Sequence, residues 1–201
     1  MELAQVLARR RMVRRYDRDR AVAPEALEQV LGAALRAPSA GFTQATSLLV
    51  LTDPTDRERF WSLTATRDSR WLEGMRTAPV LVLVVVERAA YLDRYAEPDK
   101  AHAGLADRDP DRWAAPYWFV DAGMASMAAL LAAVDLGLGA CFFGVPADRV
   151  DAVRAAFGVP AEQLCVGVVS LGHPAPGPQA EGSARRRTRR SSAELVHRGR
   201  W

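Results

Sequence analysis

Apolar residues along the chain repeat with helical spacing in two long stretches. From Pro24 to Arg36 they recur every three or four positions, and the proline stands where helices commonly begin, so we predict an amphipathic helix. The longest helix is expected from Tyr117 to Leu136, where Ala or Gly fills most positions outside one stripe of large side chains. This stripe consists of Val120, Met124, Met127, Leu131 and Val134. The small residues suit either the core or a subunit contact, and we expect both.

Shorter apolar runs predict strands. Pro79 to Val86 is an unbroken series of Val and Leu, which is typical of a strand covered on both faces. We expect Asp53-Pro54 to cap a helix that continues through Leu63, and Pro146 to begin a helix that ends at Phe157. Helices therefore alternate with strands on a central sheet, in an α+β or α/β arrangement. The other predicted strands are Ser47–Thr52, Ala140–Val145 and Leu164–Leu171.

Between Ala89 and Trp113 the apolar pattern stops. The stretch is polar and rich in turn-forming residues, as in Glu97-Pro98-Asp99-Lys100. We expect an irregular, mobile excursion from the domain here, in which substrate specificity could reside.

Length and composition bound the class of protein. With 201 residues, 49% of them apolar, we predict one globular domain that spans residues 1–201. The longest apolar runs fall short of the roughly 20 residues of a membrane-spanning helix, and the first residues lack the pattern of an export signal, so we expect a cytoplasmic protein without a membrane segment. Cys141 and Cys165 lie in strand-like surroundings, where a buried thiol is expected rather than a disulfide or a nucleophile.

The positive charge of the chain is concentrated at its C-terminal end. Residues 185–201 carry seven arginines against the single acid Glu194, a net charge of +6, which leaves −3 for the other residues. Such a tail suits nucleic acid, an anionic surface or a cofactor phosphate. Because no nucleic-acid motif accompanies it, we expect no nucleic-acid partner. A charged terminal extension is ordered only when something holds it, and we expect residues 185–201 to pack on a partner subunit.

Three separated segments carry the candidate chemistry. The first, Arg9–Tyr16, contains five arginines, and the forks of Arg10 and Arg14 could bind one phosphate dianion. Taken alone, it could equally be a solvated, basic end of a helix. The second, Ala37–Gln44, is a loop of mainly small residues that offers the Ser39 hydroxyl and the Gln44 amide to a flat ligand. A plain turn would explain it as well.

The third segment is Gly137–Gly144, between the long helix and a predicted strand. Its glycines do not follow the order of a dinucleotide-binding turn, which also runs from strand to helix rather than from helix to strand. A glycine that ends a helix is the simplest account of Gly137 or Gly139.

In their order and spacing, these segments resemble the nitroreductase family of flavoenzymes. That family combines an R-R-S-x-R stretch, a P-S-x-x-N-x-Q-P-W loop, a G-L-G-x-x-x-x-G turn and a basic C-terminal tail, and the likeness spans nearly the whole chain. It implies an α+β fold with a mostly antiparallel central sheet flanked by helices, and an intertwined homodimer. It also implies non-covalently bound FMN at the subunit interface and NAD(P)H as the electron donor.

The resemblance implies cofactor-binding roles in four places. The arginine segment and the tail would bind the flavin phosphate and ribityl chain, the loop would line the isoalloxazine from the partner subunit, and the turn would reach flavin N5 with a backbone amide. No catalytic side chain or metal ligand is expected, since the flavin performs the electron transfer. The implied residues are Arg10, Arg11, Met12, Arg14, Pro38, Ser39, Ala40, Gln44, Phe142, Phe143, Gly144, Arg187, Arg189 and Arg190.

This sequence departs from the family pattern at several positions. Met12 stands where serine is usual, Phe42 replaces the loop asparagine, and Ala45-Thr46 replaces proline-tryptophan. Trp71 and Gly74 occupy positions where some members place an amide and a lysine beside the flavin pyrimidine. Loss of that cation would weaken the stabilisation of negative charge on the reduced flavin.

The resulting prediction is an oxidoreductase that reduces nitroaromatics, quinones or related electron-poor acceptors by a ping-pong mechanism. Two alternatives stay open. One is a specialised flavin enzyme of the same fold that dehydrogenates one metabolite or reductively removes a substituent from it. The other is a flavin-binding protein with little turnover.

Overall fold

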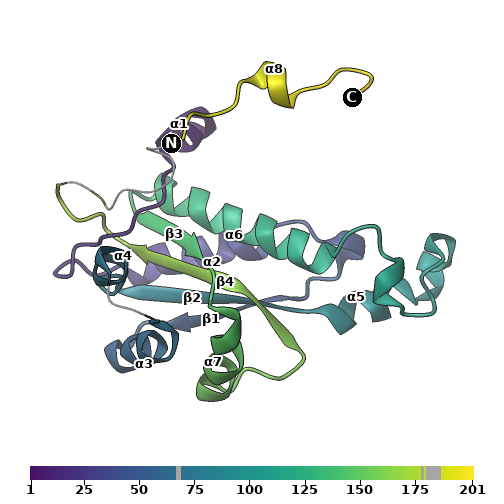
Figure 1. Ribbon diagram of the computed structural model, residues 1–201, viewed down its shortest axis with the longest axis horizontal. Helices are drawn as coiled ribbons and strands as arrows, with labels where there is room; N and C mark the ends of the chain where they lie inside the picture. Colours follow the sequence, from purple (N-terminus) through teal and green to yellow (C-terminus); the bar gives the residue numbers. More distant parts are fainter. Residues whose placement is uncertain (67–68, 178, 180–186) are drawn as a thin grey trace.

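The computed structural model describes residues 1–66, 69–177, 179 and 187–201. At its centre lies one antiparallel sheet with the strand order β1-β2-β4-β3 (Figure 1). The strands are β1 (Thr46–Leu51), β2 (Val80–Glu87), β3 (Gly139–Phe143) and β4 (Gln163–Gly172). All four expected strands are present within one or two residues of their predicted bounds, and the α+β prediction is confirmed.

Strand β2 is central and faces two separate cores. Val80, Val82, Val84 and Val86 point to one core, whereas Leu81 and Leu83 point to the other. Successive side chains of a strand point to opposite faces, so an unbroken apolar run requires cover on both sides. The prediction of a strand covered on both faces is confirmed.

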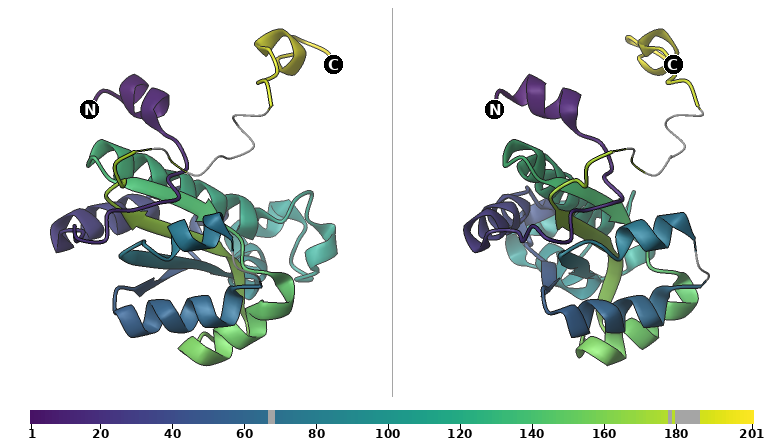
Figure 2. Two further views of the ribbon diagram at one scale, coloured as in Figure 1. Left: turned by 60° about the vertical axis from the view of Figure 1, so that its left-hand side comes forward. Right: turned by 90° about the vertical axis from the view of Figure 1, so that its left-hand side faces the viewer.

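Helices cover the two faces of the sheet in separate layers (Figure 2). On one face lie α2 (Pro24–Leu35) and α6 (Tyr117–Asp135), which pack against each other. On the other face lie α3 (Pro54–Thr64), α4 (Arg70–Met75) and α7 (Val150–Phe157), with η4 (Ala147–Arg149) before α7. The expected cap is present, since the Asp53 side chain accepts a 2.7 Å hydrogen bond from the Thr55 amide.

The long helix α6 turns its small residues to the core. Ala122, Ala125, Ala129 and Ala133 are buried, while the large side chains of the stripe point outward, with Val120 44%, Met124 38% and Met127 43% exposed. With 19 residues and a mean hydropathy of 1.5, α6 also has the length and composition of a membrane-spanning helix. Its packing against α2, β2, β3 and β4 explains the buried part of that apolar composition.

Two parts of the chain are more regular than the sequence predicts. The stretch expected to be irregular begins with the helix α5 (Arg88–Tyr95) and continues through the 3₁₀ turns η2 (Pro98–Ala103) and η3 (Pro110–Arg112). A further helix, α4, was not predicted. Both helices are short, with six and eight residues, so neither contains enough turns to give a clear apolar period.

The C-terminal end of the chain leaves the layered body, whereas the first helix stays in contact with α6. Helix α1 (Leu3–Arg9) precedes an extended segment that runs beside β3, and the last described residues form an arm with the short helix α8 (Ser192–Leu195). In Figures 1 and 2 the arm projects away from the body, and every residue from 187 to 201 is exposed.

Candidate functional site

The first and third segments meet at one edge of the sheet. Met12 forms a parallel bridge with Ala140 on β3, and the Val13 amide donates a 2.9 Å hydrogen bond to the Ala140 carbonyl. A methyl group at Gly139 would lie 2.8 Å from Val13 Cγ2, so glycine is needed for this close approach. We call this region, Arg10–Tyr16 together with Gly137–Gly144, the β3 edge.

Buried contacts lock the arginine segment in place. The Tyr16 hydroxyl lies 2.7 Å from the Val13 carbonyl and 2.7 Å from Ser170 Oγ, and the Tyr16 amide donates to Thr77 Oγ1 at 2.7 Å. Burial raises the pKa of Tyr16 above its ordinary value, so this phenol remains protonated. Beside this backbone, Arg10 and Arg14 are half-buried and Arg11 is exposed.

Gly74 has a structural reason to be glycine. A methyl group at this position would lie 2.2 Å from the Arg14 carbonyl oxygen, well inside van der Waals contact. Helix α4 therefore packs directly on the backbone of the arginine segment. Any larger side chain at position 74, lysine included, would push the two apart.

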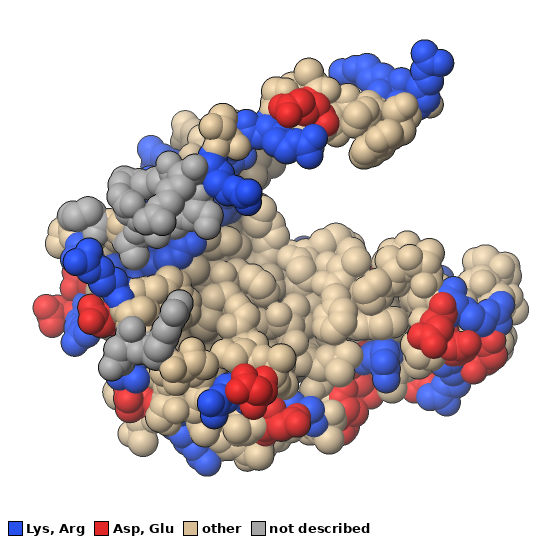
Figure 3. Space-filling model, viewed as in Figure 1, with Lys and Arg blue, Asp and Glu red and all other residues tan. Residues whose placement is uncertain are grey.

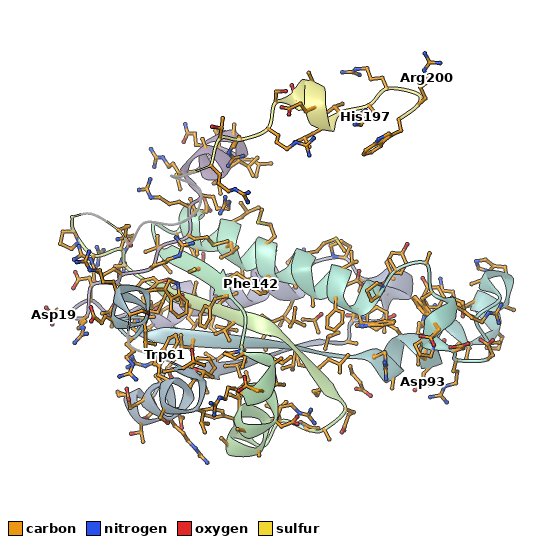
Figure 4. The ribbon with its side chains drawn as sticks, viewed as in Figure 1. Asp19, Trp61, Asp93, Phe142, His197 and Arg200 are labelled. Atoms are coloured by element: carbon orange, nitrogen blue, oxygen red, sulfur yellow. The ribbon has the colours of Figure 1, made fainter. Side chains whose placement is uncertain are left out.

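An aromatic pocket of about 240 Å³ opens at the end of the β3 edge. Phe143 stacks on Trp61, with ring centroids 5.5 Å apart and planes 13° apart, and Trp71 meets Phe143 edge-on at 5.5 Å. Trp71 is 37% exposed, and a methyl group at the exposed Gly144 would touch nothing within 4 Å. The described residues lining the pocket carry no charge. Figure 4 shows Phe142 on the sheet and Trp61 on the side of α3.

The second segment lies at the opposite edge of the sheet, directly before β1. Its loop contains the 3₁₀ turn η1 (Ala40–Phe42), in which Gly41, Phe42 and, just beyond it, Gln44 have positive φ. Ser39 Oγ accepts a 3.0 Å hydrogen bond from the Gln44 amide. A second pocket, of about 230 Å³, has Pro38, Ser39 and Gln44 in its lining. We call Pro38–Gln44 the edge loop.

Three residues that the sequence did not single out hold the edge loop. The Ala40 amide donates to Asp121 Oδ2 at 2.7 Å, and the Tyr91 hydroxyl donates to the same oxygen at 2.8 Å. Burial and the hydrogen bond to Asp121 raise the pKa of Tyr91, so it acts as a donor. From α5, Arg94 Nε donates to the Gly41 carbonyl at 2.9 Å. A signal for Asp121 was present, because it is the only charged residue between Tyr117 and Val134.

The β3 edge and the edge loop are separated by the full width of the sheet. The loop leads into β1, the turn belongs to β3, and β2 and β4 lie between them. At about 4.8 Å per strand spacing, the two outer strands are roughly 14 Å apart. The two pockets share no lining residue. Within one chain, the structure thus brings together two of the three predicted segments.

The predicted tail ligands lie apart from both regions. Arg187, Arg189 and Arg190 are exposed on the arm, where Arg190 forms an ion pair with Glu194. Figure 3 shows basic side chains along the arm above a surface with few charges, and Figure 4 places His197 and Arg200 far from the body. Arg185 and Arg186, which the sequence groups with the same tail, lie outside the described residues.

Comparison with known proteins gives consistent matches over the whole chain. Residues 7–173 match the family described as the nitroreductase family. A protein of Archaeoglobus fulgidus is 28% identical over 204 residues, covering 100% of this chain and 99% of its own length, and its provisional name is NADH dehydrogenase/NAD(P)H nitroreductase.

Solved structures match at the level of the fold. A provisionally named nitroreductase of Desulfovibrio desulfuricans, crystallised in complex with FMN, is 26% identical with a TM-score of 0.73, covering 100% of this chain and 98% of its own. An FMN-dependent nitroreductase of Clostridium difficile is 20% identical with a TM-score of 0.69, covering 98% of each chain.

Proposed function

The chain belongs to the nitroreductase family, and we propose that it is an FMN-dependent oxidoreductase that reduces nitroaromatic, quinone or related electron-poor acceptors with NAD(P)H. When bound, FMN supplies the two-electron transfer, and the donor and acceptor use it in turn in a ping-pong mechanism. A cytoplasmic location is part of this proposal, since a reduced nicotinamide must reach the site. The observation that carries the proposal is the joining of the arginine segment to the glycine turn at the β3 edge.

The β3 edge fits a flavin phosphate and the polar side of its ring. Arg10, Arg11 and Arg14 follow one another along a backbone fixed by β3, and none forms an ion pair with a described carboxylate. Arginine forks bind phosphate through paired, charge-assisted hydrogen bonds. Met12 lies between them, and the turn Phe142–Gly144, which is exposed at Gly144, would give a backbone amide to flavin N5.

The edge loop would contact the flavin of a second copy. Pro38, Ser39, Ala40 and Gln44 lie roughly 14 Å across the sheet from the turn, so one chain would not place both against the same ring. Both regions could contact the same ring if the flavin were bound between two copies of the chain. Each copy would then supply the β3 edge of one site and the edge loop of the other.

The exposed apolar side of α6 and the arm suit such a homodimer. Tyr117, Phe119, Val120, Met124 and Met127 all expose large apolar side chains, and such a patch on a soluble protein marks an interface. The surface that the arm overhangs in Figure 3 is nearly free of charge. The arm would pack on the partner and carry Arg187, Arg189 and Arg190 toward the flavin phosphate.

The aromatic pocket beside Gly144 would hold the acceptor. The partly exposed Trp71 ring in the lining offers an aromatic contact to a flat acceptor, and the described lining has no charge to favour an ionic substrate. Neutral, planar quinones and nitroaromatics are therefore the acceptors we expect to be reduced most efficiently.

An absorption spectrum of the purified protein tests the cofactor directly. We expect the bands of oxidised flavin, release of FMN on heating, and rapid bleaching of the bound flavin by NADH or NADPH in a stopped-flow trace. A colourless protein that takes up no added FMN would refute the proposal. Bleaching without turnover of any nitroaromatic or quinone would instead favour the specialised enzyme, and no bleaching would favour a flavin-binding protein.

A further inference from the structure

Two non-glycine residues of the edge loop have backbone angles that their residue types do not favour. Phe42 has a φ of 57° and Gln44 a φ of 54°, in the left-handed region that favours glycine, and Gly41 precedes them at 62°. Non-glycine residues persist there when their surroundings over-determine the conformation. Phe42 is 76% exposed, so packing of its own ring does not explain its backbone.

A buried carboxylate holds the first part of this loop. Asp121, 3% exposed on α6, accepts the Ala40 amide and the Tyr91 hydroxyl on one oxygen, at 2.7 and 2.8 Å. Within the described residues, no basic group pairs with it. A buried carboxylate without a cation depends on such donors, so its hydrogen bonds are strong and costly to break.

A guanidinium from α5 holds a second peptide unit of the loop. Arg94 donates through Nε to the Gly41 carbonyl at 2.9 Å and through its two terminal nitrogens to Asp99, at 2.7 Å each. The bidentate pair with Asp99 fixes the plane of the guanidinium. Tyr95 also packs here, because a methyl group at Gly41 would lie 2.8 Å from its ring.

We propose that Asp121 and Arg94 are positioning residues that fix the Ala40 and Gly41 peptide units and so present the edge loop in one conformation to the flavin. Asp121 on α6 accepts from the Ala40 amide, and Arg94 on α5 donates to the Gly41 carbonyl. The inference rests on the proposed function for its ligand, the flavin. The hydrogen bonds of Asp121 and Arg94 to the edge loop, which we call the clamp, are present in the chain without flavin. The stretch from Ala89 to Trp113, which was predicted to be an irregular excursion, thus helps to hold the edge loop through Arg94.

Three variants separate positioning from general stability. Asp121→Asn removes the charge but retains the shape, Arg94→Gln removes the fork at a partly exposed position, and Arg112→Gln is the control. Arg112 lies on the same excursion and pairs with Asp107, without a contact to the edge loop. Each variant is examined by hydrogen exchange of the peptide spanning residues 40–44 without flavin, by FMN titration and by thermal unfolding.

We expect exchange of the 40–44 peptide to accelerate about tenfold in Asp121→Asn and about threefold in Arg94→Gln, and FMN dissociation constants to rise by similar factors. The visible circular dichroism of bound FMN should change in both. Arg94→Lys should recover part of the affinity, because it retains one charged donor. Arg112→Gln should match the wild type.

The outcomes distinguish this inference from the proposed function. Unchanged exchange in both Asp121→Asn and Arg94→Gln would overturn the clamp. Faster exchange with wild-type FMN affinity and spectrum would overturn its role in presenting the loop. If the wild type itself binds no FMN, the proposed function fails, while the exchange measurement still tests the clamp. If Asp121→Asn does not fold, Arg94→Gln at its partly exposed site decides.

Discussion

The β3 edge and the edge loop are built by different means. The β3 edge is fixed by strand pairing and by close backbone contacts at Gly74 and Gly139. The edge loop is fixed by two polar side chains, Asp121 and Arg94, that reach it from elements far along the chain. The first region therefore depends on backbone pairing and close packing, and the second on side-chain hydrogen bonds to a loop. Substitutions should damage the first through stability and the second through ligand presentation.

The largest effect is expected at Gly74, where α4 packs on the backbone of the arginine segment. Gly74→Ala places a methyl group 2.2 Å from the Arg14 carbonyl, and we expect the free energy of unfolding to fall by about 3 kcal/mol. Gly32→Ala is the matched control. It lies inside α2 with nothing within 4 Å, so it should gain up to about 1 kcal/mol from helix propensity. Equal stabilities of the two variants in urea titrations would contradict the close approach.

Removal of the Tyr16 hydroxyl should destabilise the β3 edge less than Gly74→Ala does. In Tyr16→Phe the Val13 carbonyl and Ser170 lose a buried partner, and we expect a loss of about 1.5 kcal/mol in the free energy of unfolding. A double-mutant cycle with Ser170→Ala should give a positive coupling between the two hydroxyls. Strict additivity would mean that the hydroxyls do not interact.

Trp71 in the aromatic pocket should affect the acceptor rather than the fold. Trp71 is partly exposed, and we expect Trp71→Ala to raise KM for a neutral quinone about threefold, or roughly 0.6 kcal/mol, with little change in the rate of flavin reduction. Trp71→Phe should retain most of the affinity. A lower rate of reduction by NAD(P)H with an unchanged KM for quinone would place Trp71 elsewhere in the reaction.

The smallest effect concerns pH at the edge loop. Hydrogen bonds from Arg94 lower the pKa of Asp99 below its ordinary value, with a lesser contribution from Lys100. A carboxylate with a depressed pKa contributes stability above its unfolded pKa, near 4, and loses it as the pH falls through the folded pKa. After correction for intrinsic exchange, the 40–44 peptide should lose protection below about pH 4 in the wild type but not in Asp99→Asn. Identical pH profiles of exchange in the wild type and in Asp99→Asn would show that Asp99 does not contribute to the protection of this peptide.

Regular elements were predictable, and the contacts that build the site were largely not. Periodicity located α2, α6 and the four strands, because each is long enough to show its pattern. The hydrogen bond between Ala40 and Asp121 joins residues 81 positions apart, and no local pattern encodes such a pairing. Gly74 was interpreted as the loss of a family lysine, whereas its backbone contact with Arg14 becomes visible only in three dimensions.

The central claim is that each flavin lies between two copies, bound by the β3 edge of one and the edge loop of the other. Mixed dimers test it, using Arg14→Glu in one copy and Pro38→Trp in the other, purified through two different tags. Each variant alone should bind almost no FMN. If sites are shared, the mixed dimer combines both defects in one site and leaves the other intact, so it should bind one FMN and recover about half of the wild-type activity. A mixed dimer that binds no FMN would contradict the claim, because every site would then lie within one chain.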